Sequence, residues 1–304
     1  NQHSMNLEKK DKTWLGGNRP MVATYGKLMM WFFLMTDALT FSAFLVAYGW
    51  HRFVNTKAWP VPDDVFTHFP FIHGEYPLFF VALMTFILIM SSVTMVLAVH
   101  HGHRMNKKGV LLWLGLTIVG GVTFLGSQAW EWSHFIKGTY NGAWVSADDF
   151  IIHPIGEEKI VTGWSGEGKF INVNIDSAYY MPPSPIKTDS LSKMYYAGKL
   201  KTERHLVVGE ELRDMISSGK KVKGATLGMN EYGHRAFGDF FFFITGFHGF
   251  HVFSGVIILI IIFINVLKDT YEKRGHYEMV EKVGLYWHFV DLVWVFVFTF
   301  FYLV

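Results

Sequence analysis

The sequence contains no cysteine among its 304 residues. This absence excludes disulfides, thiolate zinc sites, iron–sulfur clusters and cysteine nucleophiles, and it leaves the redox compartment undefined. Charged residues are also scarce, at 17%, whereas a soluble domain carries roughly a quarter. With a net charge of only +2 and no basic cluster, the sequence does not indicate a nucleic-acid partner. Across the whole sequence, 51% of the residues are hydrophobic, and the aromatic residues among them make up 17% of the sequence, which indicates an integral membrane protein.

Long apolar stretches are present, and crossing a bilayer as a helix requires about 20 such residues. Because lipid offers no hydrogen-bond partner to the backbone, each of these stretches is expected to be an α-helix. We therefore predict an all-α transmembrane bundle with five spans. They fall at 26–50, 77–100, 109–132, 237–267 and 284–304.

Lysine and arginine are concentrated in alternate connections between these stretches, which predicts the orientation of the chain. The segment before the first span and the connections after the second and fourth spans are the Lys- and Arg-rich ones. We therefore expect residues 1–25 to be cytoplasmic and the C-terminus to lie outside. Residues 1–25 lack the apolar core and cleavage site of a signal peptide. The expected organisation is 1–25, spans one to three in 26–132, a periplasmic insert at 133–235, and spans four and five in 236–304.

The polar insert carries mixed structural signals. Its segment "EEKIVTGWSGEGKFINVNI" alternates and is interrupted by glycine, which favours short strands. "MPPSP" cannot continue a helix or a central strand. "RHLVVGEELRDMISSGKKV" has a weak amphipathic helical spacing. We expect an insert that is mainly irregular or β in structure.

Ionisable side chains inside membrane spans are costly and require protein, water or lipid headgroups as neighbours. Asp37 stands about eleven residues into the first span, which places it roughly 16 Å deep. Glu131 stands near the outer end of the third span. These carboxyls are candidates for buried polar contacts between helices.

His248 and His251 are three residues apart, so their side chains lie on nearly one face of the fourth span. They could ligate a haem or a metal ion together with His288, which would make the chain a membrane b-type haem protein. Alternatively, each imidazole hydrogen-bonds to a carboxylate or carbonyl on a neighbouring helix. Gly246, Gly249 and Gly255 permit close helix approach, and we therefore favour the packing interpretation.

His288 and Asp291 present the same two alternatives in the fifth span. Asp291 could orient His288 as a base, or both could contact the fourth span. No Ser-His-Asp order and no His-Glu-x-x-His signature accompanies them, so we expect no catalytic and no metal-binding residue in the chain.

Two further groups occur near the predicted membrane edges. His100, His101 and His103 lie on the cytoplasmic side, where imidazoles titrate near ~6.5 and could collect protons as an antenna. A solvated turn is the simpler interpretation. Aromatic residues at the outer edge are expected to be interface anchors. They are Trp50, Trp59, Tyr76, Trp130 and Trp132.

Several stretches together resemble subunit III of the haem–copper cytochrome c oxidases. "TGFHGFHVFSGVIIL" is similar to the family's Thr-Gly-Phe-His-Gly-x-His-Val signature, and "YWHFVDLVWVFVF" to its Tyr-Trp-His-Phe-Val-Asp-x-Val-Trp ending. "WFFLMTDALTFSAFLVAYGW", "SSVTMVLAVHH" and "FLGSQAWEW" resemble the three earlier helices in family order. The five-helix form is similar to bacterial members. The resemblance does not extend to the insert.

The resemblance implies a non-catalytic accessory subunit without haem or copper of its own, which partner subunits would supply. It implies packing against subunit I, alongside subunit II, in a bacterial cytoplasmic membrane. It also implies phospholipids held in a cleft between helical groups, with support for proton uptake and oxygen access. Asp37 aligns with the family's buried glutamate, which reacts with carbodiimide, and would border this cleft with His248 and His251. Glu131, His288 and Asp291 would then form interhelical polar contacts.

The insert is the part that the family does not explain. Because it is expected on the side where cytochrome c and other respiratory complexes dock, we interpret it as a surface for such a partner or for a supercomplex.

Overall fold

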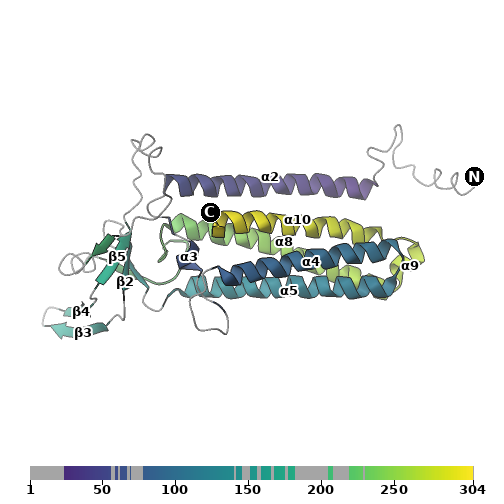
Figure 1. Cartoon of the computed structure of the whole chain (residues 1–304). Coiled ribbons are helices and arrows are strands. Elements are labelled where there is room, and N and C mark those ends of the chain that lie inside the picture. The colour runs from purple at the N-terminus through teal and green to yellow at the C-terminus, as the bar shows by residue number, and fades with distance from the viewer. Residues whose placement is uncertain are drawn as a thin grey trace, which may run out of the picture.

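Five long helices lie side by side and run in alternating directions in a computed structural model of the chain (Figure 1). All five are long and apolar enough to cross a membrane, which confirms the predicted five-span bundle. They are α2 (Tyr25–Val54), α4 (Phe79–His103), α5 (Lys107–Lys137), α8 (Arg235–Leu267) and α10 (Glu278–Phe298), the last continued by the π-helical turn η2 (Thr299–Leu303). Short helices α3 (Pro62–Val65) and α9 (Thr270–Arg274) join them.

The structure describes residues 24–55, 59–60, 62–66, 69, 78–139, 142–145, 151–155, 159–165, 168–174, 177–181, 205–207, 219–228 and 230–303. For residues 151–207 it describes strands and their pairing only. The predictions for residues 1–23 and for Tyr76 therefore lie outside the described residues.

Helix α10 begins at Glu278 rather than at residue 284, where the apolar stretch predicts its start. Glu278 and Glu281 lie in its first turn, where carboxylates interact favourably with the helix dipole. Glu281 pairs with Lys27 at 2.6 Å and Glu278 with Lys282 at 3.0 Å. Hydropathy marks only the part of a helix that crosses hydrocarbon, so this polar first turn escapes it.

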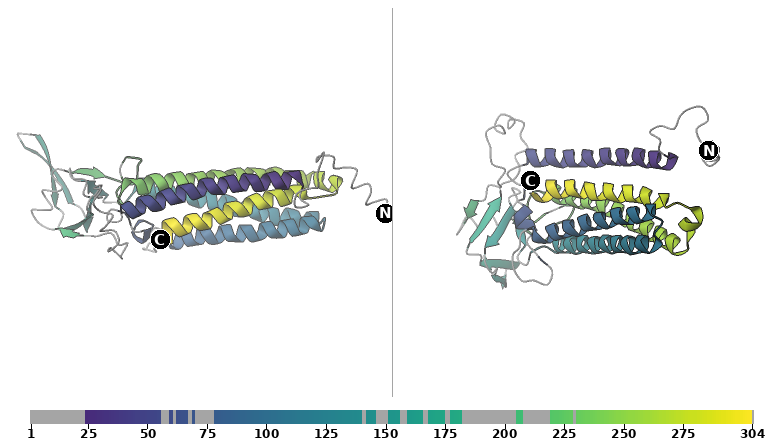
Figure 2. Two further views of the ribbon diagram at one scale, coloured as in Figure 1. Left: turned by 90° about the horizontal axis from the view of Figure 1, so that it is seen from above. Right: turned by 45° about the vertical axis from the view of Figure 1, so that its right-hand side comes forward.

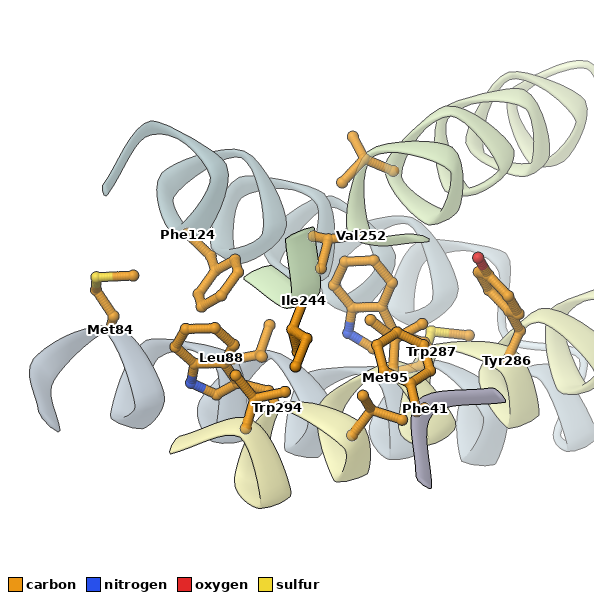
Figure 3. Close-up of a cluster of buried hydrophobic side chains, with 14 of the residues drawn as sticks. Phe41, Met84, Leu88, Met95, Phe124, Ile244, Val252, Tyr286, Trp287 and Trp294 are labelled. Atoms are coloured by element: carbon orange, nitrogen blue, oxygen red, sulfur yellow. The ribbon is translucent and has the colours of Figure 1, made fainter. Parts of the chain in front are cut away.

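Helix α10 contacts α2, α4 and α8 and so lies inside the bundle. Its Trp287 and Trp294 are fully buried, and both rings point among side chains of the other helices (Figure 3). A Cβ on Gly121 of α5 would lie 2.6 Å from Trp287 Cη2, and one on Gly255 of α8 would lie 3.0 Å from Trp287 Cζ3. The Trp287 ring therefore fills space that exists only because both positions lack a side chain.

The prediction that three glycines of α8 permit close packing is correct for two of them. Gly255 lies against Trp287, and a Cβ on Gly246 would lie 3.0 Å from Trp132. For Gly249 it is wrong, since no described atom lies within 4 Å of such a Cβ.

The insert forms a five-stranded antiparallel sheet in the order β6-β5-β2-β1-β7, beside a separate β3-β4 hairpin. It lies at the end of the bundle opposite α9 (Figure 2). The strands are β1 (Ala143–Val145), β2 (Ile151–Ile155), β3 (Lys159–Ser165), β4 (Gly168–Asn174), β5 (Ser177–Met181), β6 (His205–Val207) and β7 (Lys220–Val222). The predicted β character is confirmed.

The helix suggested by the spacing within 204–222 is not present at either end of that segment. His205–Val207 pairs with β5, and Lys220–Val222 pairs with β1; residues 208–218 lie outside the described part. Strand pairing with distant segments outweighs the weak amphipathic pattern, because backbone groups gain partners across the sheet.

A buried carboxylate joins the two ends of the insert to the bundle. Glu231 is 1% exposed, and its two oxygens each accept a backbone N–H at 2.6 Å, one from Thr139 and one from Gly224. The Ala225 N–H donates to the Phe135 carbonyl at the end of α5. Gly224 has φ +70°, and a Cβ there would lie 1.9 Å from the Ile136 carbonyl oxygen. We call this group, Glu231 with Thr139 and Gly224, the insert clasp.

Trp59 is not the interface anchor that its position predicts. It is only 3% exposed and packs on Tyr48, Phe237 and His234, with ring centroids 5.4, 5.8 and 6.0 Å away. His234 caps α8 by accepting the Ala236 N–H on Nδ1. Burial, together with nearby Arg235 and His51, lowers the pKa of His234, which favours the neutral ring that this cap requires. Trp50, at 61% exposed, fits the predicted role of an anchor.

Candidate functional site

Asp37 and His251 meet between α2 and α8. The Asp37 Oδ2 lies 3.1 Å from the His251 Nε2, and the side chains are 11% and 10% exposed respectively. The two groups are at ion-pair distance without hydrogen-bond alignment. The sequence marks both residues as polar groups inside the membrane, and the structure brings them together.

The other nitrogen of the same imidazole determines what the pair can share. His251 Nδ1 lies 2.8 Å from the Phe247 carbonyl oxygen. Since a carbonyl only accepts, Nδ1 carries a hydrogen. A favourable Asp37–His251 contact then requires one further proton, on Nε2 or on the carboxyl. Asp37 and His251 can therefore share one proton at the α2–α8 interface.

Aromatic rings surround this pair and exclude solvent from it. Phe41 lies 5.5 Å from the His251 ring and 5.1 Å from Phe247, which itself lies 4.7 Å from His251. The Tyr286 hydroxyl on α10 donates to the His251 carbonyl at 3.1 Å. Side chains of α2 and α10 thus contact the turn of α8 that carries His251.

His248 points elsewhere, although it is only three residues away. Its ring is 1% exposed and lies 5.1 Å from Trp294, 5.8 Å from Phe124 and 6.4 Å from Phe41. No described protein group hydrogen-bonds to either of its nitrogens. His248 is therefore placed in an aromatic interior, and among the described ring contacts the two histidines share Phe41.

The fifth-span pair faces α4 rather than α8. His288 Nδ1 lies 2.7 Å from the Ser92 hydroxyl. Asp291 is 7% exposed; neither of its oxygens has an aligned donor among the described residues, although Ser92 is close enough to interact with it. Contact of both residues with the fourth span was one of two alternatives, and the structure instead places His288 against Ser92 of α4.

Those tryptophans complete a row of polar contacts between α4 and α10. Trp287 Nε1 donates to the Ser91 hydroxyl at 3.1 Å, and Trp294 Nε1 donates to the Thr85 hydroxyl at 3.0 Å. A buried indole N–H usually has a hydrogen-bond acceptor as its partner. The sequence singles out His288 and Asp291 as polar residues of the fifth span, but it does not predict these serine and threonine partners. The signal that could have indicated a polar contact is their helical spacing in "TFILIMSS".

Glu131 lies near the C-terminal end of α5 and is 5% exposed. Its Oε2 accepts from Gln128 Nε2 at 2.9 Å and from the Tyr302 hydroxyl at 3.0 Å. It thereby links α5 to the π-helical turn that ends the described chain. The partner of Glu131 outside its own helix is therefore Tyr302.

The three remaining histidines of interest lie at the opposite end of the bundle. His100, His101 and His103 form the last turn of α4, with His101 half-buried and His103 exposed. His101 Nδ1 is 3.3 Å from Asn106 Nδ2. Their role as a proton antenna stays a prediction.

The intramembrane imidazoles do not converge on a common point: His251 contacts α2, His248 contacts rings on α5 and α10, and His288 contacts α4. Within the described residues, no group of three His, Asp or Glu side chains is arranged to hold a metal ion. The site thus consists of polar contacts that link α2 to α8, α4 to α10 and α5 to the chain end. What these contacts can do chemically is fix helix positions and hold protons locally.

The fold and these contacts define a multi-pass helical membrane protein whose buried polar side chains connect neighbouring spans. Comparison with known proteins shows what the chain is similar to. Residues 230–304 match the sequence model of the family described as "Cytochrome c oxidase subunit III". The chain is thus similar to the cytochrome c oxidase subunit III family.

Individual relatives extend this match to different degrees. A "Probable cytochrome c oxidase subunit 3" of Rickettsia conorii is 29% identical over 218 residues, which cover 67% of this chain and 71% of that protein. The "Cytochrome c oxidase subunit 3" of Rhipicephalus sanguineus is 46% identical over 66 residues, 22% of this chain and 25% of that protein. That of Marchantia polymorpha is 46% identical over 63 residues, 21% of this chain and 23% of that protein. The chain thus aligns with about a quarter of the length of the latter two relatives.

Proposed function

We propose that this chain is a non-catalytic accessory subunit of a respiratory haem–copper oxidase, a complex that reduces dioxygen to water with electrons from cytochrome c. Subunit I is its principal neighbour, and subunit II belongs to the same complex. The observation that carries the proposal is the Asp37–His251 contact of 3.1 Å, because it joins the first span to the family signature in α8. The haem and copper belong to the partner subunits.

The alternative is a b-type haem bound by His248 or His251 with His288. The separate contacts of the three imidazoles favour the accessory role: His251 lies at Asp37 and His288 at Ser92, so each would have to give up its partner to bind iron. A visible spectrum of the purified chain distinguishes the two. A Soret band that is lost in His248→Ala would favour the haem alternative.

The exposed face of α2 supports a role in holding lipid and subunit I. Large apolar side chains along this helix are more than half exposed, including Trp31 at 55%, Leu39 at 70% and Val46 at 71%. Membrane or a neighbouring subunit must cover such a surface. In the proposed arrangement Asp37 and His251 border a phospholipid-filled cleft and support proton uptake and oxygen access.

The proposed location is the bacterial cytoplasmic membrane, with the N-terminus inside and the insert and C-terminus in the periplasm. The insert and the C-terminal end of α10 lie at the same end of the bundle (Figure 1), as this arrangement requires. The Lys- and Arg-rich connections at the other end favour the cytoplasm for that end. His100, His101 and His103 would then lie where protons are taken up.

The role of Asp37 is tested by Asp37→Asn in the assembled oxidase, with Asp239→Asn of α8 as the matched control. Asp37→Asn removes the charge facing His251, which costs about 1–3 kcal/mol if the imidazole is left unsatisfied. We expect slower proton uptake and faster inactivation during turnover, approaching the behaviour of the complex that lacks this chain, with an unchanged haem spectrum. If only detergent stability falls while proton uptake and lifetime stay normal, the proton-supporting role is wrong.

We further propose that the insert at 133–235 contacts cytochrome c or another respiratory complex. Val145 of β1 and Lys220 of β7 are paired, so a two-residue Asn-Gly turn could replace 146–219 and keep the insert clasp. We expect this shortened chain to assemble into the oxidase but to bind cytochrome c or co-purify with the other complex more weakly. Unchanged association with both would contradict the proposal.

A further inference from the structure

A small cavity lies beside Glu131 at the outer end of the bundle. Its volume is about 30 Å³. The polar part of its wall comes from Glu131, His134 and Tyr232, and apolar side chains such as Val81 and Phe66 complete it. The cavity therefore borders one of the buried carboxyls described above.

The two oxygens of Glu131 are in unequal surroundings. Gln128 and Tyr302 both donate to Oε2. Oε1 is buried as well, yet no described protein group hydrogen-bonds to it. A buried polar atom without a partner costs about 1–3 kcal/mol, so native structures rarely leave one.

The need for a partner does not depend on the charge of Glu131. As a carboxylate, Oε1 requires a donor. As an acid with the proton on the oxygen that accepts no bond, Oε1 requires an acceptor. A water molecule can serve as either donor or acceptor.

The volume of the cavity also favours water as its ligand. A water molecule needs about 10–15 Å³ of such space, while pockets for organic ligands begin near roughly 300 Å³. The cavity is thus of the size for one or two waters and too small for lipid or substrate.

The cavity lies close to the end of the bundle from which the insert extends. Glu131 stands six residues before the last residue of α5 (Lys137), about 9 Å along the helix axis. His134 and Tyr232, which line the cavity, are only half-buried. The His134 ring lies 3.9 Å from the Trp130 ring, which holds the imidazole at the cavity wall.

We propose that this cavity is a hydration site, and that water bound at Glu131 Oε1 lets this carboxyl exchange protons with the outer aqueous phase. The groups that face it are Gln128 on α5, Tyr302 on η2, and His134 and Tyr232 on the cavity wall. Glu131 is then a proton-exchanging group on the side opposite His100, His101 and His103. This inference concerns the chain itself and does not depend on the proposed role of Asp37 or of the insert.

The test is infrared spectroscopy of the full chain in lipid nanodiscs after rapid transfer to D₂O. The carboxyl bands of Glu131 are obtained as the difference between wild type and Glu131→Gln. The measurement is made at acidic pH, where the carboxyl carries an exchangeable proton, and we expect its C=O band to shift within the mixing time. In Val81→Ile, which adds one methyl group to the cavity wall and leaves Glu131 unchanged, the shift is expected to be roughly tenfold slower or more, equivalent to about 1.4 kcal/mol in the barrier.

Val119→Ile is the control, because Val119 is 62% exposed on the bundle surface and does not line the cavity. It should leave the exchange rate unchanged. Glu131 bands that shift only as slowly as buried backbone amides in the wild type would overturn the proposal. Equal rates in wild type and Val81→Ile would also overturn it.

Discussion

Replacing Trp287 with alanine is expected to lower the free energy of unfolding by about 3–5 kcal/mol, the range for removing a large buried ring. The ring is fully buried among α4, α5 and α8, and its Nε1 donates to Ser91. Lipid tails are as apolar as the ring, so what is lost is close packing and one hydrogen bond. Unfolding of the full chain in mixed micelles measures the effect. Trp50→Ala, at an exposed position, is the control and should change little.

A double-mutant cycle tests whether the contact between Trp287 and Gly121 causes this loss of stability. In the wild type, Gly121→Ala places a Cβ 2.6 Å from Trp287 Cη2, and such overpacking costs about 1–3 kcal/mol. In the Trp287→Ala background the same change meets no ring, although the new Cβ would still lie 2.8 Å from Val256 Cγ2. Its cost should therefore be clearly smaller than in the wild type. Strictly additive effects would contradict the packing described here, because contacting residues couple by about 0.5–3 kcal/mol.

Replacing Glu231 with alanine is expected to release the insert from the bundle. The substitution leaves the N–H groups of Thr139 and Gly224 without their carboxylate oxygens, at a cost of about 1–3 kcal/mol for each buried donor. We expect faster proteolysis of the insert and loss of hydrogen-exchange protection at both amides, with the helical content retained. Glu231→Gln should be intermediate, because its amide retains one acceptor but turns a donor toward the second N–H.

Glu272→Ala provides the control for this change, since Glu272 is an exposed glutamate at the opposite end of the bundle. It should leave the insert as protected as in the wild type. Full protection of the Thr139 and Gly224 amides in Glu231→Ala would show that the insert clasp does not hold the two segments together.

The sequence predicted the candidate site residues better than their partners. Asp37 and His251 are each conspicuous as polar groups within apolar stretches, yet nothing in the local pattern pairs them. For His288 and Asp291 the sequence left open whether they act together or contact α8, and the structure places both near Ser92 on α4. Glu231 was missed because it stands in a polar segment, where a carboxylate is unremarkable. Its only local signal is a glutamate among turn-forming residues in "GMNEYGH".

The sequence by itself determined the five spans, because the thickness of a bilayer sets how many apolar residues each helix needs. It also determined the family resemblance, which lies in local motifs. Only the tertiary structure decided which face of each helix meets which neighbour. The rotation of a helix is fixed by side chains of other helices, here by Trp287 filling the space beside Gly121 and Gly255. These packing contacts join residues that are distant in the sequence. They accompany the arrangement in which His251 lies against Asp37 and His288 against Ser92.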